Sequence, residues 1–237
     1  MTRDAAISHV TDYFDAGTFQ SDLASLVAFR TESQNPAQEA RDESLRYLKE
    51  AMLPRLEALG FACEIIDNPD PRGGPLLLGE RVEAEGLPMV LTYGHGDAVL
   101  GQEGMWREGL KPWEIVEEDE RLYGRGTADN KGQHLVNIAA LEAVLATRGS
   151  LGFNTRIVIE MSEEVGSVGL PEVFETYKER LTADVLIASD GPRLQPEVPT
   201  MFMGSRGGTT FDLVVETHEG AHHSGNWGGL LADPAMI

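Results

Sequence analysis

Four short groups of residues carry side chains that could bind metal ions. Together they supply one imidazole and several carboxylates, a ligand set suited to zinc, manganese or cobalt. Each group alone has an ordinary explanation, such as a surface pair, a helix cap or a turn. Their joint occurrence at four expected strand or helix ends favours a metal site. The residues are His95 with Asp97, Asp129, the pair Glu163 and Glu164, and Asp190.

Charge balance favours two metals in this site. Two divalent cations would be neutralised by Asp129, Glu164 and Asp190 together with one bridging hydroxide. A neutral site can be partly buried without a large desolvation penalty. Paired metals lie about 3.5–4 Å apart and share the activation of one water, so a carboxylate between them is the natural spacer.

Two spacings predict further roles. His95 and Asp97 are two residues apart on an extended segment, so their side chains point the same way. Asp97 can therefore hydrogen-bond the free ring nitrogen of a metal-bound His95 and fix its tautomer. The adjacent Glu163 and Glu164 suggest a division of labour, in which one binds metal and the other takes a proton from water.

The elements that must position these residues alternate between strands and helices. Three continuous apolar runs, at 88–93, 155–160 and 184–188, predict buried strands that end at the candidate ligands. Helical spacing covers 5–30 (with a break at Gly17), 37–59, 130–147 and 167–181, and shorter strands are expected at 63–66 and 76–79. The order indicates an α/β fold with a central, mostly parallel sheet and helices on both faces. Ligands of such sheets bind beyond the carboxyl ends of the strands.

The character of the chain changes near residue 203. Residues 204–208 predict a flexible joint, and residues 209–217 alternate as a half-exposed strand does. We therefore expect a catalytic metal-binding domain over 1–203 and the start of an α+β lid domain over 204–237. The second part is too short to hold its own core. Because the chain ends just after the helix-start signal Asp233 and Pro234, we interpret the sequence as a fragment.

Composition disfavours several classes of partner. The net charge of −20 argues against nucleic acid, since phosphate binding needs clustered basic residues. No apolar run approaches the roughly 18 residues of a membrane helix, and the N-terminus lacks the apolar region of a secretory signal. The single cysteine, Cys63, excludes an internal disulfide, and these features together predict a cytoplasmic protein. A Rossmann-type nucleotide site is disfavoured because no Gly-x-Gly-x-x-Gly follows the first strand.

The four groups resemble motifs of the M20 family of metallopeptidases. The matching segments are 94–97 (Gly-His-Gly-Asp), 124–132 (Gly-Arg-Gly-Thr-Ala-Asp-Asn-Lys-Gly), 163–167 (Glu-Glu-Val-Gly-Ser) and 189–191 (Ser-Asp-Gly). They occur in the family's order and at about its separations, and the resemblance extends from about residue 26 to the end. The family contains aminoacylases, glutamate-type carboxypeptidases, succinyl-diaminopimelate desuccinylase and carnosinase-like dipeptidases. It implies a zinc-peptidase-like catalytic domain.

The resemblance implies a role for each candidate metal ligand. His95 and Asp190 would bind one metal, Glu164 the other, and Asp129 would bridge the two. The family also implies a cis peptide bond between Asp129 and Asn130. A further family histidine, far toward the C-terminus, completes the shell around the metal of Glu164, and this chain stops before it. The half of the site with His95 and Asp190 is therefore expected to be the better formed.

The resemblance also implies catalytic roles. Asp97 would orient His95, and Glu163 would act as the general base that later protonates the leaving amine. In the lid segment 220–225, His223 is the candidate for polarising the scissile carbonyl in the partner subunit's site, with His222 as the alternative.

The resulting prediction is a metal-dependent hydrolase that cleaves an amide bond in a dipeptide or an N-acyl amino acid. Two divalent ions, Zn²⁺ first and Co²⁺ or Mn²⁺ as alternatives, would activate the water. We expect a homodimer through the lid when the protein is full length, and no nucleic-acid or membrane partner. The alternative is a truncated, catalytically inactive metal-binding fragment or homologue.

Overall fold

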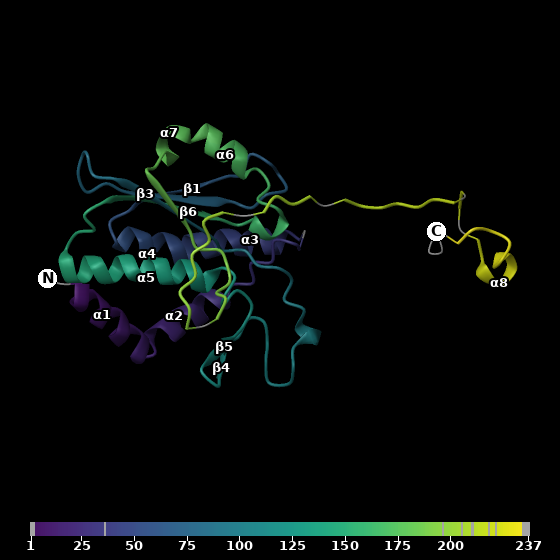
Figure 1. Ribbon diagram of the computed structural model, residues 1–237, viewed down its shortest axis with the longest axis horizontal. Helices are drawn as coiled ribbons and strands as arrows, with labels where there is room; N and C mark the ends of the chain where they lie inside the picture. Colours follow the sequence, from purple (N-terminus) through teal and green to yellow (C-terminus); the bar gives the residue numbers. More distant parts are fainter. Residues whose placement is uncertain are drawn as a thin grey trace. The chain divides into compact units, whose positions relative to one another are not determined.

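The computed structural model describes residues 3–35, 37–195, 197–204, 206–209, 211–217, 219–220 and 222–233. The chain divides into two units, residues 1–192 and 193–237 (Figure 1). All the predicted metal ligands lie in the first unit, and His223 lies in the second. The predicted functional boundary after residue 203, with a catalytic part and a lid, stays a prediction.

A five-stranded sheet forms the centre of the first unit. Its strands, in spatial order, are β1 (Ala62–Ile66), β2 (Leu76–Arg81), β6 (Asn154–Glu160), β3 (Met89–His95) and β7 (Val185–Ala188). β2 is antiparallel to both neighbours, whereas β3 is parallel to β6 and to β7. Four strands therefore run in one direction, which confirms the mostly parallel sheet. Because His95 pairs with Glu160, β3 and β6 end side by side.

Helices cover both faces of this sheet, as predicted (Figure 1). On one face lie α3 (Gln38–Arg46), the π-helical turn η1 (Tyr47–Met52), α4 (Leu53–Ala58) and α5 (Lys131–Arg148). Their apolar side chains, among them Leu48, Met52 and Ile138, form the larger core with Ile157 and Ile159 of β6. The helices α1 (Arg3–Asp15) and α2 (Thr18–Val27) pack beside α5.

The opposite face is covered by α6 (Leu170–Thr176) and α7 (Lys178–Leu181). Val173 and Leu181 of these helices form a second core with side chains from the sheet, including Leu91 and Val158. Three short elements complete the unit: the hairpin of β4 (Val116–Glu118) and β5 (Arg121–Tyr123), and the turns η2 (Glu103–Met105) and η3 (Glu163–Val165). Within the described ranges, none of the helices combines the length and hydrophobicity needed to cross a bilayer.

Two predicted elements differ from the structure. The helix predicted over 167–181 starts only at Leu170, because Ser167 and Gly169 have positive φ values of 50° and 81° that a right-handed helix cannot contain. It is also divided at Tyr177, whose φ and ψ of −102° and 20° are not helical. The strand predicted over 209–217 is wrong for its described residues, which form no ladder. Alternation alone does not make a strand without a partner to hydrogen-bond. The helix expected after Asp233 falls on residues 234–237, outside the described ranges.

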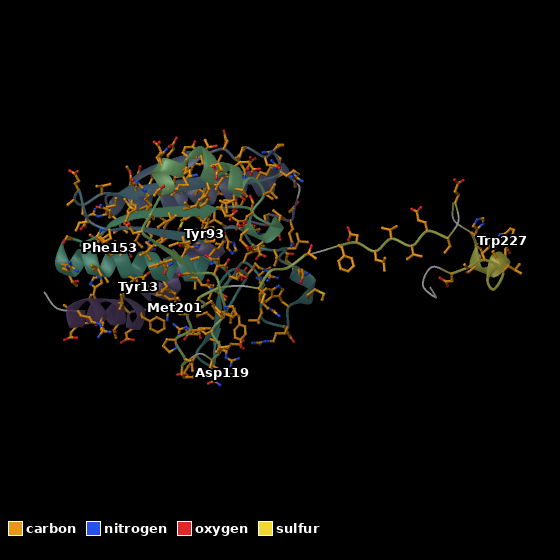
Figure 2. All side chains as sticks on the ribbon, turned by 45° about the horizontal axis from the view of Figure 1, so that its top comes forward. Tyr13, Tyr93, Asp119, Phe153, Met201 and Trp227 are labelled. Atoms are coloured by element: carbon orange, nitrogen blue, oxygen red, sulfur yellow. The ribbon has the colours of Figure 1, made fainter. Side chains whose placement is uncertain are left out.

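The second unit contains a short helix, α8 (Ser224–Trp227). The ring of His222 lies edge-on to that of Trp227, which is labelled in Figure 2, with the centroids 5.6 Å apart. His223 precedes this helix, and its Nδ1 accepts the backbone N–H of Gly225 at 3.0 Å. This contact lies within the second unit, and the role of His223 at a reacting carbonyl stays a prediction.

Candidate metal centre

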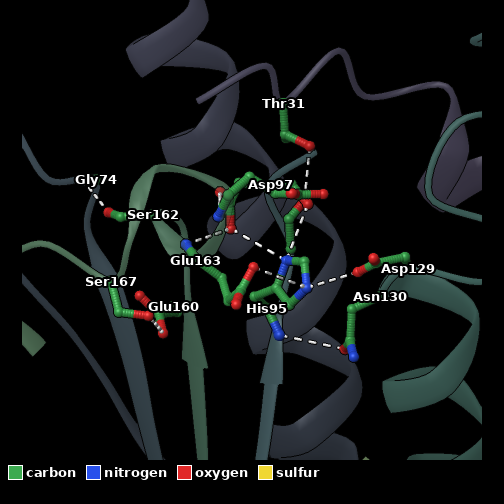
Figure 3. Close-up of polar contacts among 12 residues, drawn as sticks. Thr31, Gly74, His95, Asp97, Asp129, Asn130, Glu160, Ser162, Glu163 and Ser167 are labelled. Atoms are coloured by element: carbon green, nitrogen blue, oxygen red, sulfur yellow. Dashed lines mark hydrogen bonds and ion pairs between the residues drawn. The ribbon is translucent and has the colours of Figure 1, made fainter. Parts of the chain in front are cut away.

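His95, the last residue of β3, lies at the centre of the site, with its side chain fully buried. Its Nε2 lies 2.9 Å from Asp129 Oδ1 and 3.9 Å from Glu163 Oε2 (Figure 3). The same nitrogen lies 3.8 Å from Asp190 Oδ2. One ligand atom each from His95, Asp129 and Asp190 lie within 4.8 Å of one another. The structure thus brings together three of the four predicted metal ligands, from the ends of β3 and β7 and the start of α5.

The electrostatics of this group suit a cation. Burial opposes protonation of His95, but hydrogen bonds and charges from Asp190 and Asp97 outweigh it and raise the pKa of the imidazole to about 11. One imidazole therefore faces an excess of carboxylates, whose repulsion a divalent ion would relieve. Nitrogen and carboxylate oxygen are the donors that Zn²⁺, Co²⁺ and Mn²⁺ accept. The residues present therefore fit a divalent metal.

Asp97 connects His95 to the glutamate pair. It is fully buried, and its backbone carbonyl and its Oδ1 lie 3.1 and 3.3 Å from His95 Nδ1. Its two carboxylate oxygens also accept the backbone N–H groups of Glu163 and Glu164, at 3.2 and 3.1 Å. The ring contact matches the predicted orienting role. The contacts to the two amides were not predicted, because they depend on where β6 ends relative to β3.

The glutamate pair lies on η3, directly after β6. Burial raises the pKa of both carboxyl groups, opposed at Glu163 by the charge of His95 and reinforced at Glu164 by the charge of Asp129. Over the described part of the chain, the tight group of three ligand atoms does not include Glu164. The charge of His95 acts on both glutamates, whereas Asp129 is the largest charge effect on Glu164 alone.

Asn130 has contacts in the site that its place in the motif over 124–132 did not predict. The peptide bond between Asp129 and Asn130 is cis, as the resemblance implied. The buried Asn130 side chain accepts the backbone N–H of His95 at 3.2 Å and donates to Ser189 O at 2.6 Å and Asp190 Oδ1 at 3.3 Å. Asn130 is also the N-cap residue of α5. The alternative that Asp129 is only a helix cap does not hold, because its carboxylate contacts His95.

Glu160 was also missed. This last residue of β6 is buried, and its Oε1 accepts hydrogen bonds from Tyr93 Oη at 2.5 Å and Ser167 Oγ at 2.8 Å. Glu160 thus connects β3 to the segment that follows the glutamate pair. One sequence signal could have identified Glu160. It is a carboxylate at the end of an apolar strand, next to a strand that carries a predicted ligand.

Comparisons with known proteins identify a family and several relatives. The family described as Peptidase family M20/M25/M40 matches residues 91–222. The cysteinylglycine-S-conjugate dipeptidase of Corynebacterium striatum is 34% identical over 183 residues, which cover 76% of this chain and 39% of that protein. The Beta-Ala-His dipeptidase of Homo sapiens is 32% identical over 243 residues, which cover 97% of this chain and 47% of the relative. This chain thus spans less than half the length of these relatives.

Solved structures agree with the fold. Human carnosine dipeptidase 1 matches with a TM-score of 0.70 at 31% identity, over 78% of this chain and 41% of that chain. The dipeptidase Dug1p from Saccharomyces cerevisiae matches with a TM-score of 0.76 over 98% of this chain and 50% of its own, at 21% identity. The second match supports the fold alone.

Proposed function

The chain belongs to Peptidase family M20/M25/M40, and on that basis we propose that the protein is a metal-dependent hydrolase that cleaves the amide bond of a dipeptide. The convergence of His95, Asp129 and Asp190 within 4.8 Å carries this proposal. Relatives named as dipeptidases favour a dipeptide, and an N-acyl amino acid is the second substrate class. A lid over 204–237, a lid-mediated homodimer and a cytoplasmic location belong to the same proposal and rest on the resemblance and composition.

His95 and Asp190 are assigned to one divalent ion, Glu164 to a second, and Asp129 to the position between them. The support is that Asp129 Oδ1 lies 2.9 Å from His95 Nε2, and that the charge of Asp129 adds to burial in raising the pKa of Glu164. When bound, the metals would supply an acidified water and stabilise negative charge that develops on the carbonyl oxygen. Zn²⁺ is the first choice, and Co²⁺ or Mn²⁺ suit the same donors.

Glu163 is assigned as the general base. It takes one proton from the attacking water as the C–O bond forms, and it returns that proton to the amine as the C–N bond breaks. Its Oε2 already faces the site, 3.9 Å from His95 Nε2, and burial raises its pKa, which strengthens a carboxylate as a base. Asp97 holds the backbone N–H of Glu163, so the position of the base is coupled to that of His95. His223 is assigned to the scissile carbonyl on the motif over 220–225 alone.

The test is Glu163→Gln, which keeps the shape of the side chain and removes its basicity. We expect metal content to stay at the unaltered level while hydrolysis of dipeptides and N-acyl amino acids falls by about 10²–10⁴-fold. Glu179→Gln, at an exposed glutamate of α7, is the control and should leave both unchanged. Full activity of Glu163→Gln would refute the base assignment. Metal-loaded, unaltered protein that hydrolyses neither substrate class would refute the proposed function.

A further inference from the structure

A chain of buried polar side chains lies behind the metal centre and takes no part in the reaction proposed above. It joins Tyr47, His134 and Asn130, whose exposed fractions are 0%, 1% and 0%. We propose that Tyr47 and His134 are positioning residues, which act through the Asn130 amide to hold His95 and Asp190 in the geometry that binds metal. The inference rests on the proposed function, because it concerns the same metal centre.

The partners of Asn130 determine which way its side-chain amide faces. Oδ1 accepts the backbone N–H of His95, while Nδ2 donates to Ser189 O and to Asp190 Oδ1. A flipped amide would set an N–H group against the N–H of His95 and an oxygen against two other oxygens. Only one orientation therefore satisfies both sides of the site.

His134 extends this pattern away from the metal centre. Its Nδ1 lies 3.1 Å from Asn130 Oδ1, and its Nε2 lies 2.5 Å from Tyr47 Oη. Because Asn130 Oδ1 can only accept, we assign the ring proton to Nδ1, so Nε2 accepts the Tyr47 O–H. Burial first, and then the charges of His95 and Lys131, lower the pKa of His134 to about 3, which agrees with a neutral ring. The hydrogen bonds then run in one direction from Tyr47 to Asp190 and polarise one another.

Asn130 connects the end of β3, the end of β7 and the start of α5 at a point beyond the last hydrogen-bonded pair of the sheet. The ladder between β3 and β7 ends at the pair Tyr93 and Ala188. Beyond it, the Asn130 amide bridges His95 and Asp190, and its backbone directly follows Asp129. A rotation of this one amide would therefore shift the whole group of three ligands.

The glycines on either side of His95 provide independent support. A Cβ atom at Gly94 would lie 2.7 Å from His134 Cβ and 3.1 Å from Asn130 Oδ1. A Cβ atom at Gly96 would lie 2.4 Å from Tyr47 Cε1. Both glycines thus let the backbone around His95 lie directly against the chain of polar side chains. This close packing transmits the position of Tyr47 and His134 to His95.

The Tyr47 hydroxyl is itself held in place. The Lys131 ammonium lies 5.2 Å from the centroid of the Tyr47 ring, and the Phe29 ring meets it edge-on at 5.6 Å. Lys131 in turn donates to Phe29 O at 2.7 Å. Since the ring is fixed on two sides, its hydroxyl is a rigid end point for the chain.

The experiment compares Tyr47→Phe, His134→Leu and the double variant in the full chain, with Co²⁺ as the probe. Tyr47→Phe leaves a buried imidazole nitrogen without a partner, which lowers the melting temperature of the apoprotein. The double variant removes both polar groups, so much of that loss should be regained. If Tyr47 and His134 had a merely structural role, the Co²⁺ affinity of the double variant should recover together with its melting temperature. A positioning role predicts that Co²⁺ binds about 10- to 100-fold more weakly in both variants that lack His134, with an altered visible spectrum.

Asn137→Ala is the matched control. Asn137 lies on α5 and exchanges hydrogen bonds of 2.8 and 3.1 Å with Ser189 Oγ, so the variant removes a contact between α5 and the same strand end without touching the Asn130 amide. We expect its Co²⁺ affinity and spectrum to match the unaltered protein. An equal loss in Asn137→Ala, or unaltered Co²⁺ binding in the double variant, would overturn the inference and leave the proposed function standing. Absence of Co²⁺ binding by the unaltered protein would instead refute the proposed function itself.

Discussion

The two halves of the proposed metal centre are constructed differently. One half takes His95, Asp129 and Asp190 from three separate elements, and their ligand atoms meet within 4.8 Å. The other half carries Glu163 and Glu164 on the single turn η3, where the carboxylate of Asp97 accepts both of their backbone N–H groups. The first half therefore depends on contacts between elements, and the second on the local position of one turn.

This difference has consequences for how each half should respond to substitution. Side chains that converge from several elements lose their geometry when any connecting group is removed. In the inference proposed above, Asn130 is that group, because its amide bonds both His95 and Asp190. Side chains on one turn move together, so their positions depend mainly on what holds the turn. The expectation from the sequence, that the half with His95 and Asp190 is better formed, stays a prediction that the variants below address.

The largest effect should come from removing one ligand from each half. Asp190→Ala should weaken the tighter site by more than the roughly 10- to 100-fold that is typical of residues outside the metal's own ligand set. Glu164→Ala should leave one tightly bound ion per chain, since His95, Asp129 and Asp190 are untouched. Metal content after dialysis and titration calorimetry with Zn²⁺ measure both, with Glu172→Ala on the exposed side of α6 as the control. If Glu164→Ala lost both ions while Asp190→Ala kept one, the two halves would have to be exchanged.

An intermediate effect is expected at Asp97, which joins the halves. Asp97→Asn replaces one carboxylate oxygen by an N–H group, which would face the N–H of Glu163, Glu164 or His95. We expect metal affinity and kcat each to fall by about 10- to 100-fold.

The control for that variant is Asp184→Asn, because Asp184 Oδ2 likewise accepts a backbone N–H, that of Met89 at 2.7 Å, at the other end of β3. It should change stability without changing metal affinity. Equal metal affinity in Asp97→Asn and the unaltered protein would show that the two halves are independent.

The sequence predicted the sheet well because buried parallel strands have a local signature. The apolar runs at 88–93, 155–160 and 184–188 correspond to β3, β6 and β7 within two residues at each end. The strand over 209–217 failed for the converse reason, since alternation marks a face but does not supply a partner strand. The helices were also predicted from a local pattern, the spacing of their apolar residues. The exception is the start of α6, which positive φ values delay to Leu170.

The site was predictable only where its residues lie in contiguous motifs. His95, Asp97 and Asp129 were identified from spacing and resemblance, and they lie together. The contact between Tyr47 and His134 joins residues 87 positions apart, and neither residue has a motif that links it to the metal ligands. Their placement follows from packing α5 and η1 on the same face of the sheet. Such contacts depend on tertiary structure and leave no local pattern to detect.

The smallest effect is expected at Thr31, which hydrogen-bonds the backbone between His95 and Asp97 but contacts none of the proposed metal ligands in that bond. Thr31 Oγ1 donates to Gly96 O at 2.6 Å, between His95 and Asp97, and Thr31 is fully buried (Figure 3). Thr31→Val keeps the shape but leaves this carbonyl without that donor, so the free energy of unfolding should fall by about 1–2 kcal/mol. Denaturant unfolding of the apoprotein measures this free energy. The control is Thr147→Val, which removes a hydroxyl bonded to Ala143 O in its own helix and should have a smaller effect.

The metal affinity of Thr31→Val should stay close to the unaltered value, because Asp97 and Asn130 still hold His95. A tenfold loss of Zn²⁺ affinity in Thr31→Val would mean that the backbone of Gly96, rather than the Asn130 amide, determines where His95 lies.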